Sequence, residues 1–201
     1  MADQKTYKEK PKPIHPEGQF AALCVDFIDH GECVIEFPGS DSYVGEKVRY
    51  IWNTECLNPD TQKPFEPNVE YTVSMSQKAN LRKALEAWRG KPYTPEQIEA
   101  GIPFHKVVGQ WCMLTIAHVP TKAGRLFAKV TGIAPLHPAI PKPELPVYKR
   151  NEFWAKVTKE YAEKVATFRH QDSAFAQQFA DDQFPDAFPE APEDDMDSLP
   201  F

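Results

Sequence analysis

Cations and aromatic rings alternate at short spacing on one predicted strand of this chain. In the run 125–129, Arg125, Phe127 and Lys129 alternate with smaller or branched apolar residues. Because successive side chains of a strand point to opposite faces, the ring and its two flanking cations share one face. Cations attract phosphates, and flat rings stack on bases with about 1–3 kcal/mol per base. This spacing favours binding of single-stranded nucleic acid.

Other predicted strands contribute further residues of the same kinds. On one of them, Lys47 and Arg49 lie on one face, and Tyr50 and Trp52 lie on the other. Trp52 is either a stacking platform for bases or part of the core. Trp111 begins another strand. It either stacks on bases or covers the end of the barrel. The predicted nucleic-acid-binding residues are Lys47, Arg49, Tyr50, Trp52, Trp111, Arg125, Phe127 and Lys129.

The C-terminal stretch combines acidic residues with an apolar end. Residues 171–201 contain nine acidic residues and no Lys or Arg, and four prolines interrupt them. Like charges and prolines predict a disordered acidic tail. We interpret its tip as a docking motif for partner proteins, formed by Asp194, Asp195, Asp197, Leu199, Pro200 and Phe201. A plain solubilising tail is the alternative interpretation.

Charge is distributed unevenly along the chain. The net charge is −6, yet residues 1–170 hold all 23 Lys and Arg against 20 acidic residues, which makes this part +3. Such a division fits an anion-binding body with a competing polyanionic arm. Residues 19–134 hold 12 Lys and Arg against 13 acidic residues, so nucleic-acid affinity depends on where the charges lie.

The sequence lacks the motifs of enzymes and of metal sites. No P-loop, dinucleotide-binding, serine-hydrolase or zinc-protease motif is present, and the six His and four Cys are scattered singly. Asp26 and Asp29 are three apart on a predicted strand, so they point to opposite faces. We therefore expect no enzymatic activity, no cofactor and no metal, with reduced thiols and a cytoplasmic location because the first residues are polar.

The hydrophobic pattern predicts a mainly β fold. Strands are expected at 20–29 and 32–37 around a turn at His30 and Gly31, and at 47–53, 69–75, 110–119 and 125–133. A helix is expected at 77–89, with Ser76 as its N-cap and Gly90 as its stop, and a short one within 92–101 after Thr94. With 20–29 and 32–37 counted together as the first strand, this order is that of an OB-fold, a five-stranded Greek-key barrel with one helix between strands three and four.

Five segments follow from this pattern. A flexible basic N-terminal arm occupies residues 1–18, and the OB-fold nucleic-acid-binding domain occupies 19–134. A Pro-rich connector follows at 135–147 and an amphipathic helix at 148–170, in which Phe153, Val157 and Tyr161 are four apart. We expect this helix to dock on the barrel or on a second copy of it, and the disordered tail at 171–201 completes the chain.

Two stretches resemble known proteins. The terminus from Asp194 to Phe201 resembles the acidic tip of bacterial and phage single-stranded DNA-binding proteins (SSBs), although Leu199 stands where the bacterial proteins usually have Ile. The runs 47–52 and 79–90, with Gly109, resemble a family of small replication-associated proteins of tailed bacteriophages.

The resemblance implies an OB-fold phage SSB that works in the host cytoplasm. Such a protein binds single-stranded DNA with little sequence preference during DNA replication, recombination and repair. Its tip recruits replication and recombination proteins, and its acidic arm competes with DNA for the basic groove. A homo-oligomer is compatible with this function. The alternative is a protein-interaction adaptor with a small β-barrel and a solubilising acidic tail.

Overall fold

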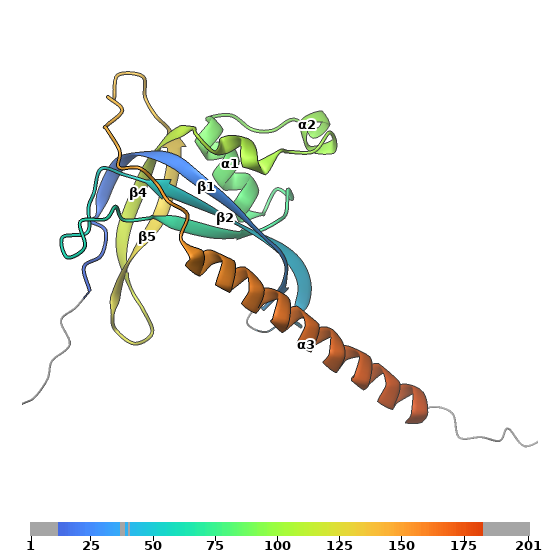
Figure 1. Ribbon diagram of the computed structural model, residues 1–201. Helices are drawn as coiled ribbons and strands as arrows, with labels where there is room; N and C mark the ends of the chain where they lie inside the picture. Colours follow the sequence, from blue (N-terminus) through green and yellow to red (C-terminus); the bar gives the residue numbers. More distant parts are fainter. Residues whose placement is uncertain (1–11, 37–38, 40, 183–201) are drawn as a thin grey trace, which may run out of the picture. The chain divides into compact units, whose positions relative to one another are not determined.

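The computed structural model describes residues 12–36, 39 and 41–182, and Figure 1 shows its elements. The chain divides into two units, Met1–Val165 and Ala166–Phe201. The first is mainly β, as the sequence predicts. Its strands are β1 (Gly18–Ile35), β2 (Tyr43–Asn53), β3 (Asn68–Thr72), β4 (Trp111–Pro120) and β5 (Leu126–Pro135). Helices α1 (Asn80–Arg89) and α2 (Pro95–Glu99) and the 3-10 turn η1 (Phe104–Val107) lie between β3 and β4, and α3 (Glu152–Asp182) follows β5.

One antiparallel sheet contains all five strands in the order β3-β2-β1-β4-β5. β1 pairs with β4 through residues 18–23 and with β2 through residues 23–35. Its pairing with β2 shifts register twice, between Cys24 and Asp26 and between Asp29 and Gly31. Bulges of this kind bend a strand and increase its twist, so β1 carries the sheet around a corner.

The turn predicted at His30 and Gly31 is wrong, because β1 continues through it. Gly31 has φ 63°, and its amide donates to Asp29 Oδ1 at 2.8 Å. A glycine readily adopts the left-handed conformation that a bulge needs, and the ladder skips His30 and resumes at Gly31, which pairs with Lys47. The glycine therefore marks a bulge inside one strand.

The sheet is open, so the predicted closed barrel is not found. β3 and β5 form its two edges, and no ladder joins them in the described residues. β3 has only five residues, and Pro64 and Pro67 precede it. Proline removes an amide donor, which disfavours a longer ladder at this edge.

The core lies on the inner face of the sheet, under α1. Leu81, Leu85 and Trp88 lie on one side of α1 and are buried, as their spacing predicts. Fully burying an aliphatic side chain such as Leu81 contributes roughly 1.5–3 kcal/mol. They pack against residues of β1, β2 and β4, among them Tyr50 and Trp52.

The ends of the helices follow local rules with one exception. Gly90 ends α1 with φ 73°, and Thr94 forms a capping box with Gln97 at the start of α2. The predicted N-cap Ser76 is wrong: α1 begins at Asn80 after Ala79, which has no side-chain cap bond. The carbonyl of Ser76 instead accepts the Ala79 amide at 3.0 Å, in a turn that precedes the helix.

Both ends of the folded part differ from the prediction. The folded part includes His15, which is 4% exposed and whose Nε2 lies 2.8 Å from Thr54 Oγ1, so the arm predicted to be flexible to residue 18 is anchored there. At the other end, α3 continues to Asp182 instead of stopping at 170. Residues 172–182 contain several Ala and Gln and no Pro, a composition that favours continuing a helix.

Candidate nucleic-acid interface

The outer side of β5 presents the predicted row of ring and cations to solvent. Phe127 is 41% exposed, and Arg125 and Lys129 are exposed on either side of it. In the described part of the chain, no acidic side chain forms an ion pair with either cation. Ala128 and Val130 pack toward the core as predicted, but Leu126 is 56% exposed because it pairs with Pro120 at the outer end of the hairpin.

A tight turn positions this row. The Thr121 amide donates to the Arg125 carbonyl at 2.7 Å, and the Arg125 amide donates to Thr121 Oγ1 at 3.1 Å. Gly124 has φ 75°, a conformation that L side chains rarely adopt. The turn places Arg125 directly before β5, and within β5 the alternation of side chains puts Phe127 and Lys129 on the same side.

A cleft of about 510 Å³ separates the two edge strands. Residues 127–130 of β5 line one side, and residues 65–70, which lead into β3, line the other. Residues 13–15 contribute to its wall. The open seam of the sheet therefore runs beside Phe127 and Lys129.

Trp111 keeps part of its surface exposed at the start of β4. Its carbonyl accepts the indole N–H of Trp88 at 3.2 Å, and Lys142 Nζ lies 5.9 Å from the centre of its ring. Trp88 itself is 8% exposed and belongs to the core. Trp111 thus lies at the rim of the core and remains a candidate for base stacking.

Tyr50 and Trp52 do not offer a ring to a base. Each is 1% exposed, and the two ring centres are 6.0 Å apart within the core. Tyr50 Oη donates to the Phe104 carbonyl at 3.3 Å, and burial raises the pKa of this phenol. The core interpretation of Trp52 is therefore the correct one, and we remove both residues from the binding surface.

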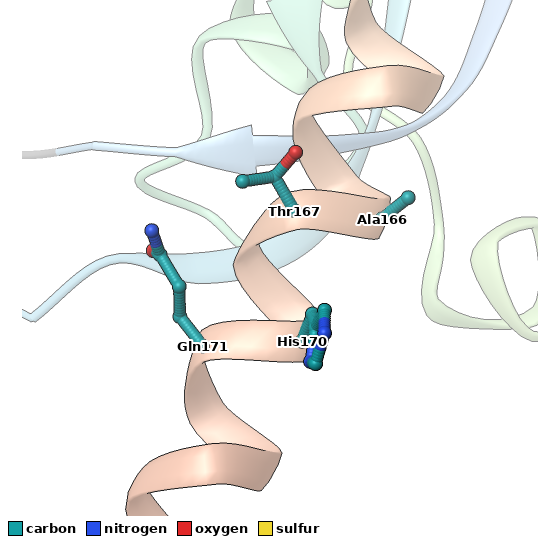
Figure 2. Close-up of a pocket in the computed structure, with 4 residues that line it drawn as sticks. All are labelled: Ala166, Thr167, His170 and Gln171. Carbon is teal, nitrogen blue, oxygen red and sulfur yellow. The ribbon is translucent and has the colours of Figure 1, made fainter.

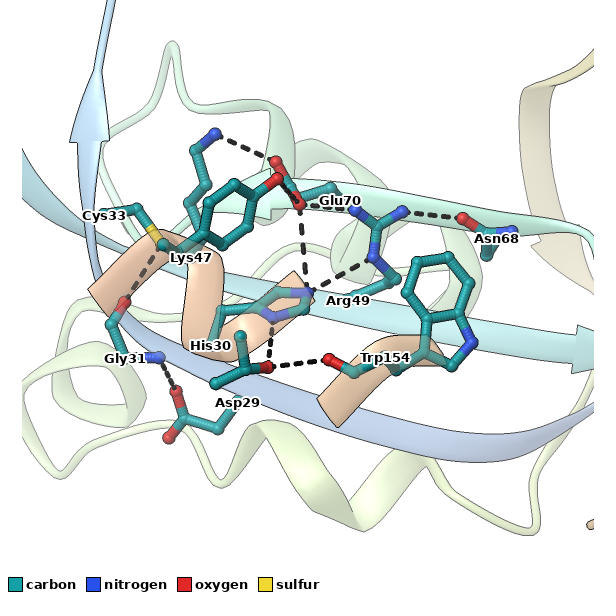
Figure 3. A network of polar contacts seen from close by, with 11 residues as sticks. Asp29, His30, Gly31, Cys33, Lys47, Arg49, Asn68, Glu70 and Trp154 are labelled. Atoms are coloured by element: carbon teal, nitrogen blue, oxygen red, sulfur yellow. Dashed lines mark hydrogen bonds and ion pairs between the residues drawn. The ribbon is translucent and has the colours of Figure 1, made fainter. Parts of the chain in front are cut away.

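Lys47 and Arg49 lie on the outer face of β2, as predicted, but both are already engaged. Lys47 Nζ lies 2.9 Å from Glu70 Oε1, and Arg49 Nη2 lies 2.5 Å from Glu70 Oε2. Arg49 Nη1 also donates to Asn68 Oδ1 at 2.7 Å (Figure 3). Their predicted role as free phosphate ligands does not fit this pairing, since one carboxylate on β3 holds both cations.

The first half of α3 covers these cations. The ring of Trp154 stacks on Arg49, with 4.4 Å from the guanidinium carbon to the ring centre (Figure 3). Lys47 Nζ lies 5.1 Å from the ring centre of Tyr161, whose hydroxyl donates to Glu70 Oε2 at 2.9 Å. The predicted docking of this helix on the sheet is found, through Trp154 and Tyr161 more than through Phe153, which is 55% exposed.

His30 completes the network and is neutral. Arginine only donates, so the Arg49 Nε–H must donate to His30 Nε2, at 3.3 Å. The proton of the ring is then on Nδ1, which donates to Thr158 Oγ1 at 2.7 Å, and Thr158 donates to the Trp154 carbonyl at 3.1 Å. Burial, and next the charge of Arg49, lower the pKa of His30.

The Glu70 side chain is charged, whereas that of His30 is neutral. Burial alone would raise the pKa of this carboxyl, but hydrogen bonds from Lys47 and Tyr161 outweigh it and hold the pKa below its ordinary value. Glu70 therefore stays ionised and keeps both cations in place. Sequence reasoning missed Glu70 and His30; the available signal was the position of Glu70 opposite Arg49 once β2 and β3 are paired.

The segment before α3 is anchored to the same outer face. Asp26 Oδ2 accepts the Tyr148 hydroxyl at 2.9 Å and Arg150 Nε at 2.7 Å. Asn53 Nδ2 donates to the Pro146 carbonyl at 2.8 Å. The end of the predicted connector therefore lies against β1 and β2.

In the second unit, a shallow hollow lies beside Ala166, Thr167, His170 and Gln171 of α3 (Figure 2). Figure 2 shows Thr167 and Gln171 pointing to one side of the helix and Ala166 and His170 to the other. These side chains do not combine rings with cations in the manner of β5. We assign no binding function to this hollow.

Other predictions concern residues or ligands that the described structure does not address. The partner-binding tip, with Asp194, Asp195, Asp197, Leu199, Pro200 and Phe201, lies outside the described residues. Within them, no group of three or more His, Cys, Asp or Glu is placed to hold a metal ion. The helices of this part of the chain include none with the length and apolar character needed to cross a membrane.

Comparison with known protein families, curated proteins and solved structures finds no match for this chain.

Proposed function

We propose that this chain binds single-stranded DNA with little sequence preference, through the outer row of β5 and the adjoining cleft between β3 and β5. The observation that carries the proposal is the exposure of Phe127 between Arg125 and Lys129, with no acidic partner for either cation in the described residues. A ring between two cations suits a base between two phosphates.

The strand arrangement supports an OB-type architecture that is open at one seam. A long, bent first strand that pairs with both the second and the fourth, and a helix between the third and fourth, are the expected features. The turn between strands four and five is one of the loops with which OB-folds bind oligonucleotides, and here it leads directly to Arg125.

The surface favours single strands over duplexes. A base must leave its stack to meet the face of Phe127, and an unpaired strand does so at lower cost than a paired one. With two cations in the row, the electrostatic part of the affinity is modest and sensitive to salt. In the full proposal, the acidic tip recruits replication and recombination proteins, as the resemblance to SSBs implies.

Titration of a labelled oligo-dT with the full chain at low ionic strength tests the proposal. We expect binding to oligo-dT and weaker binding to a duplex of equal length. Phe127→Ala should weaken oligo-dT binding about 5- to 150-fold, the equivalent of losing one stacked base. Tyr43→Ala is the matched control, because Tyr43 is also an exposed ring, 47% exposed, and lies at the start of β2, outside both β5 and α3.

Two results would contradict the proposal. Absence of oligo-dT binding at low salt would favour the adaptor alternative, in which the sheet binds a protein. Equal affinities of the chain and of Phe127→Ala would show that the β5 row is not the contact surface.

A further inference from the structure

We infer that residues 152–165 of α3 act as an internal competitor of single-stranded DNA. They cover a second cationic subsite, Lys47 and Arg49, which DNA reaches only when this part of the helix lifts from the sheet. The inference rests on the proposed function and adds its regulation.

The contacts under the helix are the kinds of contact that a nucleotide makes. The ring centre of Trp154 lies 4.4 Å from the guanidinium carbon of Arg49, where a base would stack, and the Glu70 carboxylate holds both cations, as a phosphate would. Tyr161 lies over Lys47 in the same way. The protein therefore fills this face with its own ring and carboxylate groups.

The covered subsite adjoins the proposed binding surface. Asn68 and Glu70, which hold Arg49, also line the cleft between β3 and β5. Phe127 and Lys129 line the opposite side of the same cleft. A strand bound along β5 and entering the cleft would arrive beside Arg49, so the two subsites form one path.

Polar contacts that water and phosphate can replace help to hold the docked helix, beside the buried Val165, which is 4% exposed. In the described residues, the buried indole nitrogen of Trp154 has no hydrogen-bond partner, which costs about 1–3 kcal/mol. Lys47 and Arg49 share a single carboxylate, and the neutral His30 adds no charge, so this cluster keeps a net charge of +1. Both features weaken docking and favour an incoming polyanion.

A phosphate of DNA can also replace Glu70 as the partner of one of the two cations. The carboxylate can release one cation to a phosphate while it keeps the other, because its two oxygens bind Lys47 and Arg49 separately. Such an exchange leaves Glu70 paired with one cation, and the released counterions of the DNA provide the driving force.

The double variant Trp154→Ala/Tyr161→Ala, made in the full chain, tests the inference. Faster amide hydrogen exchange in residues 152–165 reports that the helix has lifted. We then expect oligo-dT to bind roughly ten-fold more tightly at about 0.1 M salt. The slope of log affinity against log salt should steepen by about 1.4, because each phosphate of a single strand contributes about 0.7.

Adding Lys47→Ala and Arg49→Ala to this variant provides the matched control. If the gain comes from the uncovered cations, the fourfold variant loses both the higher affinity and the steeper slope. A thermal melt of each variant confirms that the sheet is folded.

The results separate this inference from the proposed function. Oligo-dT binding that Phe127→Ala weakens but Trp154→Ala/Tyr161→Ala leaves unchanged would overturn the inference alone. Unchanged hydrogen exchange would also overturn it, because the two rings would then not hold the helix. Absence of binding by both the chain and the double variant would overturn the proposed function as well.

Discussion

Two cationic surfaces occupy the same sheet, and they differ in what covers them. On β5, Arg125 and Lys129 are exposed, and no acidic side chain among the described residues pairs with them. On β2, Lys47 and Arg49 share Glu70 and lie beneath two rings of α3. Both surfaces follow the same strand alternation, so their local sequences look alike.

The difference shows that a distant segment decides whether a cation is available. Tyr161 is 91 residues from Glu70 in sequence, yet its hydroxyl completes the coordination of that carboxylate. An open surface binds at once, whereas a covered surface binds only after an internal contact breaks.

Reversing the charges of the open surface should have the largest effect. We expect Arg125→Glu/Lys129→Glu to weaken oligo-dT binding at least about 100-fold at low salt, since two phosphate contacts become repulsive. The control is Lys78→Glu/Lys91→Glu, which changes the charge equally at two exposed lysines that flank α1 and lie outside β5 and α3. Equal losses in both variants would mean that net charge, and not the β5 row, sets the affinity.

Acidification should act on the covered surface, with a smaller effect. The pKa of His30 is lowered from its ordinary 6.5 in the folded chain. Between the lowered pKa and 6.5, the unfolded chain therefore binds a proton that the folded chain excludes. His30 therefore contributes stability that is complete above about pH 6.5 and declines as the pH falls below it. The groups facing it are Arg49, Lys47, Glu70 and Asp29.

Urea denaturation at several pH values checks this expectation. His30→Asn should flatten the decline in the free energy of unfolding below about pH 6.5. The pKa of His15 is lowered too, mainly by burial, so part of the decline should remain in this variant. A profile of His30→Asn parallel to that of the unchanged chain would show that the network does not respond to this proton.

Local patterns predicted much of the fold because they depend on neighbouring residues. The opposite faces of β2, the apolar stripe of α1 and the cap at Thr94 all follow from spacing of two to four residues. The same rules predicted the exposed row at Arg125, Phe127 and Lys129.

The remaining features depend on contacts between distant segments. Alternation separates Tyr50 and Trp52 from Lys47 and Arg49, but it does not tell which face is the core, and here both faces of β2 are covered. In the sequence, Gly31 suggests a turn. Only the pairing of residues 31–35 with β2 shows that Gly31 belongs to a bulge within β1.

Photocrosslinking of a thiouracil-substituted oligo-dT to the full chain, followed by peptide mapping, tests the central claim most directly. The account predicts that the crosslinked peptide contains Phe127 and its neighbours on β5. Crosslinks that map elsewhere and spare residues 125–130 would contradict it.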